Sequence, residues 1–339
     1  MAKYCLNRSS VGGVVMKNWV RKWFHIRPCL WGVLSAAGVV GCAATFMGFL
    51  GKYSWFLDLF SHFRVQYMVC LVALGVLFGL ARRHRMALFC VVFAGINAGV
   101  VFPLYVGGSA VVAPCEPSVR VLCLNVNTER GNPDRVKRVI EDATPDIVVL
   151  EEINLQWVFD LLWLSETHPY SCIQPRSDNF GIGLFSKVPI AKQNIINIGR
   201  AQVPSIIATL ELPFTNLTVV ATHPLPPWGR DYSALRNDQL DGLLGYIESD
   251  VPLILVGDLN MTPWSYHFKR LLKQSGLMDS TKGFGVQPSW SSFNPLLRIP
   301  IDHCLHTPDV SVVGRRIGEA VGSDHYPLIV DLVVGSGER

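Results

Sequence analysis

Residues 251–263 read VPLILVGDLNMTP, a mostly apolar run that ends at Gly257, Asp258 and Asn260. An apolar run of this length is typical of a strand buried on both faces, and Gly257 can relax the chain where the strand ends. Because alternate residues of an extended chain point to the same side, Asp258 and Asn260 would lie side by side. Functional sites are often built at such strand ends, although an Asx turn would place the same residues there.

Similar polar residues follow other apolar runs of the chain. A carboxylate with amide and water ligands suits Mg²⁺, a His backed by an Asp suits a general base, and Asn can donate to a developing oxyanion. Together they predict one site that cleaves a phosphate ester with a metal ion. The segments are VLCLNVN (Asn125, Asn127), VVLEE (Glu151, Glu152), VVATHP (His223), RIPIDHC (Asp302, His303) and GSDHYP (Asp324, His325).

The outer part of the chain, residues 119–334, interleaves expected strands with fewer expected helices and is interpreted as one domain. We expect an α/β fold with two sheets face to face and helices outside. Residues 107–118 would form a linker. The expected strands are 119–126, 147–151, 181–186, 204–211, 217–222, 251–256, 301–305 and 326–334, and the expected helices are 133–143, 155–164, 232–248 and 264–274.

Seven motifs in order, LNVN, VVLEE, GIGLFSK, THP, GDLN, IDH and GSDHYP, resemble the endonuclease/exonuclease/phosphatase superfamily (DNase I-like). The resemblance runs from about residue 119 to residue 332, and GDLN and SDH are its most specific parts. It implies a four-layer α/β sandwich. The whole chain, with its apolar N-terminal third, resembles a membrane-anchored bacterial branch of this family.

The resemblance implies a site for Mg²⁺, with Mn²⁺ as the alternative ion. Glu152 resembles the principal metal ligand, Asn125 lies close to metal and phosphate, and Asp324 resembles a second metal-site carboxylate. Asn127 departs from the abasic-site branch, which has Asp there, and this favours the deoxyribonuclease-like and sphingomyelinase-like branches. Glu151 stands where several members have Gln and is given a supporting role only.

The resemblance also implies the catalytic roles. His325 resembles the general base and Asp302 its orienting partner. Asp258 resembles the carboxylate that orients the attacking water or assists proton transfer, and Asn260 resembles a donor to the transition state. His223 resembles a histidine that acts on the leaving group, although a loop histidine with ordinary hydrogen bonds would fit the same residue.

Four polar residues have simpler interpretations. Glu151 is expected to be a solvated neighbour, and His303 is expected to be structural because it points away from the preceding Asp in a strand. Arg230 and Arg236 either reach a phosphate or face solvent. The four outer cysteines lack zinc spacing, and their pairing is left open; they are Cys115, Cys123, Cys172 and Cys304.

Three uncharged apolar stretches, 29–51, 65–81 and 86–106, predict three transmembrane helices after a basic tail of residues 1–28. The tail carries six Lys and Arg residues, and the loop 82–85 reads RRHR. By the positive-inside rule both are cytoplasmic, so three spans place the catalytic domain outside the cytoplasm, on the periplasmic or extracellular side. The aromatic first loop, KYSWFLDLFSHFR, is expected at the membrane interface.

Residues 115–339 hold 19 basic and 25 acidic residues and lack the basic footprint of a duplex-binding protein. The sequence therefore predicts a membrane-anchored, Mg²⁺-dependent phosphodiesterase or phosphatase, acting outside the cytoplasm on a lipid headgroup or a small phosphodiester. An extracytoplasmic DNA or RNA endonuclease is the alternative within the family. A catalytically silent, membrane-tethered binding module is the alternative of another class.

Overall fold

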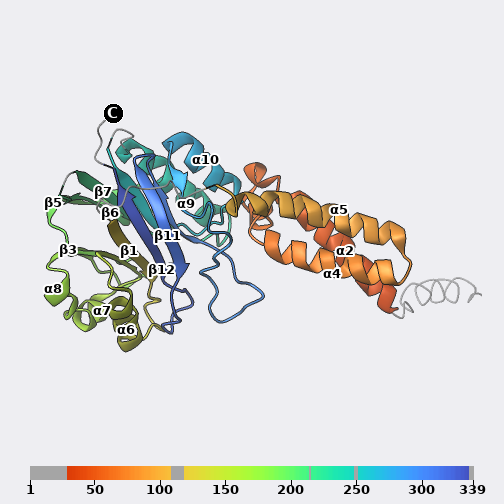
Figure 1. The fold of residues 1–339 in the computed structure, drawn as a ribbon, viewed down its shortest axis with the longest axis horizontal. Helices are drawn as coiled ribbons and strands as arrows, with labels where there is room; N and C mark the ends of the chain where they lie inside the picture. Colours follow the sequence, from red (N-terminus) through yellow and green to blue (C-terminus); the bar gives the residue numbers. More distant parts are fainter. Residues whose placement is uncertain (1–28, 108–117, 214, 248–250, 336–339) are drawn as a thin grey trace, which may run out of the picture.

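The computed structural model describes residues 29–107, 118–213, 215–247 and 251–335. A bundle of three helices projects from a domain built on two sheets (Figure 1). The predicted tail 1–28, nearly all of the linker 107–118 and Cys115 lie outside the described residues.

The domain contains two six-stranded sheets of mixed direction. In spatial order, the first is β11 (Val310–Ile317), β12 (Leu328–Val334), β1 (Ser118–Asn125), β2 (Ile147–Glu151), β4 (Ile182–Ser186) and β3 (Tyr170–Gln174). The second is β5 (Ile190–Ile198), β6 (Val203–Glu211), β7 (Asn216–Thr222), β8 (Leu253–Asp258), β10 (Asp302–His306) and β9 (Met278–Asp279).

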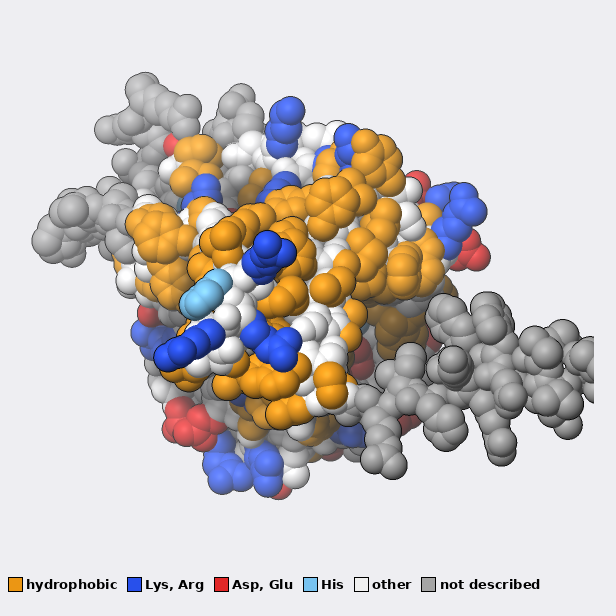
Figure 2. All heavy atoms as spheres, turned by 90° about the vertical axis from the view of Figure 1, so that its right-hand side faces the viewer, with side chains coloured by type: hydrophobic (Ala, Val, Ile, Leu, Met, Phe, Trp, Pro, Cys, Tyr) orange, Lys and Arg blue, Asp and Glu red, His pale blue; other side chains and the backbone are white. Residues whose placement is uncertain are grey.

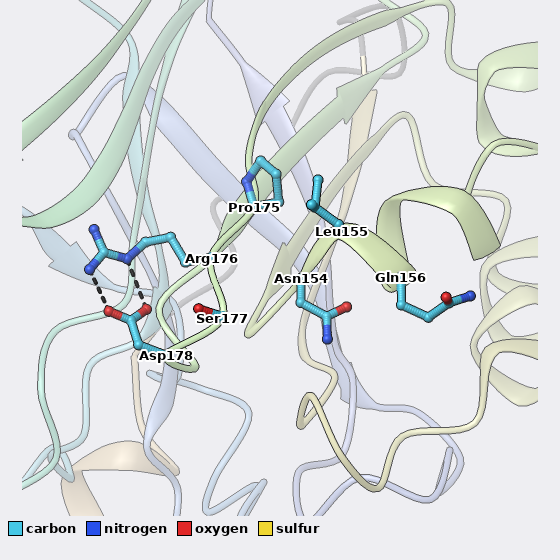
Figure 3. A pocket seen from close by; sticks show the side chains of 7 residues that line it. All are labelled: Asn154, Leu155, Gln156, Pro175, Arg176, Ser177 and Asp178. Atoms are coloured by element: carbon cyan, nitrogen blue, oxygen red, sulfur yellow. Dashed lines mark hydrogen bonds and ion pairs between the residues drawn. The ribbon is translucent and has the colours of Figure 1, made fainter.

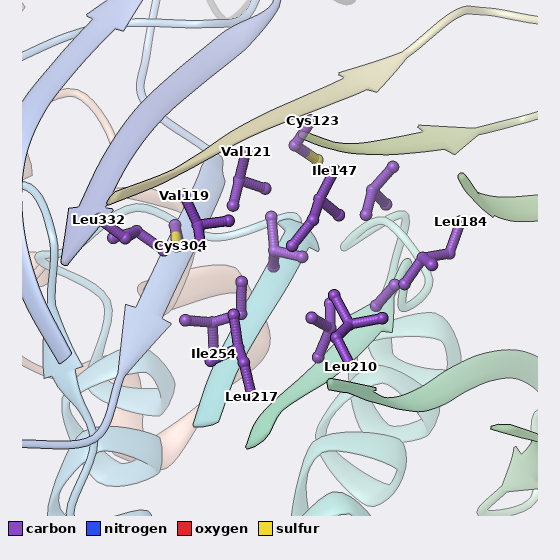
Figure 4. Packing of buried hydrophobic residues seen from close by; sticks show 14 of the residues in the cluster. Val119, Val121, Cys123, Ile147, Leu184, Leu210, Leu217, Ile254, Cys304 and Leu332 are labelled. Atoms are coloured by element: carbon purple, nitrogen blue, oxygen red, sulfur yellow. The ribbon is translucent and has the colours of Figure 1, made fainter. Parts of the chain in front are cut away.

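Hydrophobic side chains between the sheets form the central core (Figure 4). Helices α6 (Pro133–Ala143), α7 (Leu155–Asp160) and α8 (Leu164–Thr167) pack on the outer face of the first sheet. Helices α9 (Arg230–Leu243) and α10 (Tyr266–Ser275), with the 3₁₀ turn η3 (Leu244–Tyr246), pack on the second. These four layers confirm the predicted α/β sandwich.

Strand β1 shows why the central strands read as continuous apolar runs. Val121 and Cys123 point into the core between the sheets, while Leu122 and Leu124 point to the helices outside. Both faces are buried, so the period-two pattern of polar residues is absent.

Four strands that the sequence did not predict are β3, β5, β9 and β11, and each is an edge strand of its sheet. In β5 most residues are exposed or half-buried. Edge strands of this kind carry polar side chains that blunt association with other chains, so they lack a strand-like apolar pattern. The predicted helix 155–164 was too long, because α7 ends at Asp160.

The bundle consists of α2 (Leu30–Met47), α4 (Arg64–Leu80) and α5 (His84–Val101), with short elements η1 (Gly51–Tyr53), α3 (Trp55–Leu59) and η2 (Phe102–Leu104) at the domain end. Two helical stretches, Leu30–Met47 and His84–Leu104, are long and apolar enough to cross a membrane, whereas Arg64–Leu80 is shorter. Three membrane spans therefore stay a prediction. Viewed from its tip, the bundle shows mostly hydrophobic side chains with Lys, Arg and His at the end (Figure 2).

The loop between α2 and α4 is bonded to the two-sheet domain. Asp58 is buried and accepts hydrogen bonds from Ser265 Oγ at 2.9 and 3.0 Å. His62 Nδ1 lies 3.0 Å from Thr262 Oγ1. Part of the loop therefore lies in a protein contact, and this was not predicted from its aromatic composition.

Gly257 is expected to tolerate no side chain, because a Cβ there would collide with the carbonyl oxygen of Thr222 and lie 2.5 Å from Glu151 Oε1. Gly257→Ala should lower the free energy of unfolding by at least about 2 kcal/mol through overpacking. Thermal unfolding of the full chain in detergent measures this. Gly245→Ala is the control, since no heavy atom lies within 4 Å of that position. Equal midpoints for the two variants would contradict the packing argument.

Candidate active site

The predicted site residues converge at one end of the sandwich, where strand ends of both sheets meet. Strands β1 and β2 are a parallel pair, as are β7 and β8, so their carboxyl ends share an edge. Strand β10 runs antiparallel to β8 and starts at the same edge. The contributing positions are the ends of β1 (Asn125), β2 (Glu151) and β8 (Asp258), the residue after β7 (His223), the start of β10 (Asp302) and the segment before β12 (Asp324, His325).

Asp258 lies at the centre of the cluster and is 1% exposed. Its Oδ2 is 3.5 Å from His223 Nε2 and 3.5 Å from His325 Nε2. Its Oδ1 accepts a hydrogen bond of 2.8 Å from the Asn260 backbone N–H. Burial alone would raise the pKa of Asp258, but the two histidines outweigh burial and lower that pKa.

His325 and Asp302 form a buried pair, with His325 Nδ1 2.9 Å from Asp302 Oδ2. This contact directs Nε2 of His325 toward Asp258. Burial lowers the pKa of His325, but the carboxylates of Asp302 and Asp258 raise it to about 10. The arrangement is that of a base oriented by a carboxylate.

His223 packs on the other side of Asp258, with its ring 5.5 Å from the ring of Phe180. Burial lowers the pKa of His223, but the hydrogen bond to Asp258 and the charge of Glu151 raise it to about 9. His223 is therefore bonded to the cluster rather than to the loop that carries it.

Glu151 was expected to be solvated, and that expectation is wrong: it is fully buried. Both of its carboxylate oxygens lie 3.1 Å from the Asp258 backbone nitrogen, whose N–H they accept. Burial raises the pKa of Glu151 to about 8; His223 opposes the rise, and Asp258 and Asp302 add to it. The alternation of β2 explains the error, because Glu151 follows Ile147 and Val149 into the interior between the sheets. Glu152 lies after the end of β2, with φ of 61°, and lines the pocket.

Glu152 and Asn125 lie together beside Asp258. Asn125 Nδ2 donates to Glu152 Oε1 at 2.9 Å. Asp324 is held differently, because its Oδ1 accepts from Asn127 Nδ2 at 2.7 Å and its Oδ2 from Trp290 Nε1 at 2.9 Å. Asn127 thus donates to Asp324, which an Asp at this position could not do.

The donor set beside Glu152 fits a magnesium ion. Among the described residues, no group of three or more His, Cys, Asp and Glu side chains is placed to hold a metal. Mg²⁺ needs fewer protein ligands, because it keeps several waters and is bound through one or two carboxylates. Glu152 offers a carboxylate that lines the pocket. Asn125 Nδ2 donates to that carboxylate, and the Asn125 amide oxygen accepts the Asn127 backbone N–H at 3.0 Å. Metal dependence itself stays a prediction.

Arg236 neither reaches the pocket nor faces solvent, so both alternatives for it were wrong. It is buried, its Nη2 lies 3.6 Å from Asp58 Oδ2, and its Nη1 donates to the backbone carbonyl of Asn260 at 3.1 Å. Burial lowers the pKa of Arg236, and Asp58 opposes this. Arg230 is exposed, as one alternative had it. His303 is buried and bonded to the Met261 carbonyl, as expected of a structural residue.

A cavity of about 500 Å³ lies over the cluster. Glu152, His223, Asp258, Asn260, Asp324 and His325 line it. Asn125 and Asp302 lie behind these residues, each bonded to one of them. The structure thus brings all eight predicted site residues together. Sequence reasoning missed the apolar lining, which includes Leu59 and Phe63 from the helical bundle, because no local pattern signals a contact across such a separation.

A second hollow lies beside this cavity, lined by Asn154 and the segment 175–178 among others (Figure 3). Its basic side chain, Arg176, is turned to Asp178, and Arg176 Nε donates to Asp178 Oδ1 at 2.8 Å. Asn154 caps α7 through the N–H of Trp157. The polar groups of this hollow are therefore occupied by local contacts.

The chain belongs to the endonuclease/exonuclease/phosphatase family, whose model matches residues 122–325. The match spans every motif from LNVN to GSDH, so the family is that of phosphoester-hydrolysing enzymes to which the motifs pointed.

Solved structures share the fold. An endonuclease/exonuclease/phosphatase from Beutenbergia cavernae superposes with a TM-score of 0.54 at 19% identity, over 64% of this chain and 72% of that chain. D. rerio TDP2, solved with a single-strand DNA product, gives 0.55 at 18% identity, over 64% and 99%. The human Nocturnin catalytic domain, solved with a sulfate anion, gives 0.53 at 19% identity, over 64% and 94%. These TM-scores, at identities of 18–19%, support a common sandwich fold.

Without added metal, stability is expected to fall as pH rises. The native pKa values of Glu151, His223 and His325, about 8, 9 and 10, exceed the ordinary values of 4.5, 6.5 and 6.5. Between pH 6.5 and 10 the native state therefore binds more protons than the unfolded state, and stability decreases with pH across that window. Below pH 6.5 the buried histidines His62, His303 and His306, whose pKa values burial lowers, oppose this trend. Thermal unfolding of the full chain in EDTA, followed by tryptophan fluorescence, tests this.

The histidine contribution should appear between pH 6.5 and 10. In that window His325→Gln is expected to have a shallower decline in melting temperature than the unaltered chain. A melting temperature that rises with pH in EDTA, or an unchanged slope in the variant, would contradict the charge arrangement.

Proposed function

We propose that this chain is a membrane-anchored, Mg²⁺-dependent phosphodiesterase-type hydrolase that acts outside the cytoplasm. The observation that carries the proposal is the convergence of the His325–Asp302 pair and Asp258 on the pocket that Glu152 lines. A base, its orienting carboxylate and an oxygen ligand for a metal then face one bound phosphoester.

His325 is the general base in this proposal. Its Nδ1 is held by Asp302, so its Nε2 is free to take a proton from a water at the pocket floor. Asp258 Oδ2, 3.5 Å from that Nε2, accepts a hydrogen bond from the same water and orients it. Water then attacks phosphorus, opposite the bond that breaks.

Two further side chains act on the departing and equatorial oxygens. His223 is held protonated by Asp258 and Glu151, and it donates a proton to the leaving oxygen. Asn260 Nδ2 donates one hydrogen to the Pro224 carbonyl at 2.9 Å, and its second hydrogen remains for a phosphoryl oxygen.

Glu152, with Asn125 beside it, would hold the magnesium ion. When bound, the ion supplies positive charge that polarises the phosphoryl oxygens and lowers the pKa of the nearby histidines. His325 can then be neutral, as a base must be, at a lower pH than in the metal-free site.

The arrangement of the bundle supports the proposed membrane sidedness. The α2–α4 loop contacts the catalytic domain through Asp58 and His62, so loop and domain share one side. The α4–α5 turn lies at the far end of the bundle (Figure 1), and its basic residues Arg82, Arg83 and Arg85 are exposed there. The positive-inside rule places that end in the cytoplasm.

A nuclease is the second candidate within the family. D. rerio TDP2, which shares the fold, was solved with a single-strand DNA product. Against this candidate, the described residues that line the pocket include no Lys or Arg, whereas nucleic-acid binding depends on basic contacts to phosphates.

A silent binding module is the candidate of another class. Such a module would not need the buried base–carboxylate pair of His325 and Asp302.

Activity should depend on His325 and Glu152. With Mg²⁺, the full chain in detergent is expected to hydrolyse bis-p-nitrophenyl phosphate and to lose activity in EDTA. His325→Ala and Glu152→Ala should each lower kcat by about 10²- to 10⁴-fold, because they remove the base and the metal ligand. Release of p-nitrophenol is the measurement.

The control is His84→Ala, an exposed histidine at the turn between α4 and α5, which should retain full activity. Unchanged kcat in folded His325→Ala would remove the proposed base. Lost stability with no metal-dependent activity in any variant would favour the silent module.

The sidedness makes a separate prediction. An alkaline phosphatase, which folds only outside the cytoplasm, should be active when fused after residue 335 and inactive when fused after residue 84, in bacterial cells. The basic tail and the Arg82–Arg85 turn should retain their ends in the cytoplasm. The opposite pattern of activities would overturn an extracytoplasmic catalytic domain.

A further inference from the structure

The helical bundle supplies one wall of the catalytic pocket. Leu59, His62 and Phe63, from α3 and the segment before α4, line the same cavity as Asp258 and His325. This wall has an apolar part, Leu59 and Phe63, and a polar part, His62. The bundle therefore builds part of the site as well as carrying it.

His62 presents an unused hydrogen-bond donor in this wall. Its Nδ1 accepts from the Thr262 backbone N–H at 3.4 Å and lies 3.0 Å from Thr262 Oγ1. With Nδ1 accepting, the ring proton is on Nε2. That Nε2 is buried and has no hydrogen-bond partner among the described residues. Burial lowers the pKa of His62 to about 4, so the ring is neutral.

A further part of the pocket lining is apolar and partly open to solvent. It includes Trp228, Tyr232 and Ile299. Trp228 is 79% exposed and stacks on Tyr232 with 6.4 Å between ring centroids. A large exposed aromatic residue at the mouth of a polar site is unusual for a soluble substrate and typical of a site that meets apolar chains.

The loop that precedes β10, which contributes Ile299 to the pocket lining, is bonded to the bundle. Gln66 Nε2, in the first turns of α4, donates to the Arg298 carbonyl at 2.9 Å. The neighbouring segment exposes large apolar side chains, with Leu296 78% and Phe293 54% exposed. These residues belong to the loop that precedes β10, and the same loop is bonded to the bundle through Arg298.

From this geometry, and resting on the proposed function, we propose that the pocket takes a phosphodiester lipid of the membrane in which the bundle lies. The phosphoester lies over Asp258 and His325, the glycerol and first acyl carbons lie between Leu59 and Trp228, and His62 Nε2 donates to an oxygen of the head region. An amphiphile matches a pocket with a polar floor and apolar walls, whereas a polyanion finds no Lys or Arg among the lining residues.

The reaction is hydrolysis with no co-reactant other than water. A bond forms between the water oxygen and phosphorus, and one phosphorus–ester oxygen bond breaks. The water proton passes to His325, and the leaving oxygen receives a proton from His223. The products are a phosphomonoester and an alcohol.

The test uses the full chain reconstituted with Mg²⁺ in vesicles of phosphatidylethanolamine and phosphatidylglycerol, with lipid products measured by mass spectrometry. Bis-p-nitrophenyl phosphate and plasmid DNA are assayed in parallel. The unaltered chain is expected to cleave vesicle lipid. Leu59→Gln and Trp228→Ala should each lower the ratio of lipid cleavage to soluble diester cleavage by about tenfold, because each removes an apolar contact made only by the lipid.

His62→Phe retains the ring and removes the donor, and it should lower kcat/KM for vesicle lipid by about fivefold. Phe56→Ala is the matched control, because Phe56 belongs to the same helix α3, is 51% exposed and is not part of the pocket lining. It should leave both activities unchanged. Thermal unfolding of each variant separates lost folding from lost binding.

Three results would overturn the inference. Cleavage of the soluble diester without cleavage of lipid would reject the lipid substrate, while the proposed hydrolase would stand. Cleavage of DNA in preference to lipid would also reject the lipid substrate and would favour a nuclease. A lipid-to-diester ratio unchanged in folded Leu59→Gln and Trp228→Ala would reject the apolar walls. Cleavage of no substrate by the folded chain would reject the hydrolase and the lipid together.

Discussion

The buried carboxylate of Asp258 is the constraint on which the rest of the site depends. Burying a charge is costly unless opposite charges and hydrogen-bond donors surround it. His223, His325 and the Asn260 N–H provide that compensation. His223 and Asn260 follow the neighbouring strands β7 and β8 of one sheet. His325 precedes β12 of the other sheet, so the full set forms only where the two sheets pack face to face. Behind Asp258, Glu151 of the first sheet accepts the backbone N–H of Asp258 in the second, so a polar bond joins the sheets where the apolar core ends.

The segment 258–265 connects this site to the helical bundle. Its first residues, Asp258 and Asn260, face the pocket, and its last, Ser265, is bonded to Asp58. Arg236 closes the connection, since it pairs with Asp58 and donates to the Asn260 carbonyl. Removing one member of a buried pair leaves an uncompensated charge. The geometry of Asn260 therefore depends on the bundle as well as on the sandwich.

The sequence predicted the interior of the fold better than its margins. Central strands such as β1 and β8 are buried on both faces, so their sequences are long apolar runs. Edge strands such as β5 are largely exposed, so their sequences contain no such run. Site residues were found because Asn, Asp, Glu and His recur at strand ends. The errors at Glu151 and Arg236 share a cause: each is buried by a partner more than a hundred residues away, and a local pattern contains no information on such a partner.

Charge and contact, which are independent of each other, support the same proposed sidedness. One end of the bundle is basic and carries Arg82, Arg83 and Arg85. The other end contacts the catalytic domain through hydrogen bonds of Asp58 and His62. A chain that crosses between these ends three times must put its first loop and its last domain together. In that arrangement the aromatic first loop would serve the membrane surface and the pocket at once, because it exposes Tyr53 and buries Asp58 and His62. In the proposed membrane arrangement, a phosphoester held at that junction would lie at the level of the lipid headgroups. A wall with an apolar part and a hydrogen-bond donor would match the chemistry on both sides of that level.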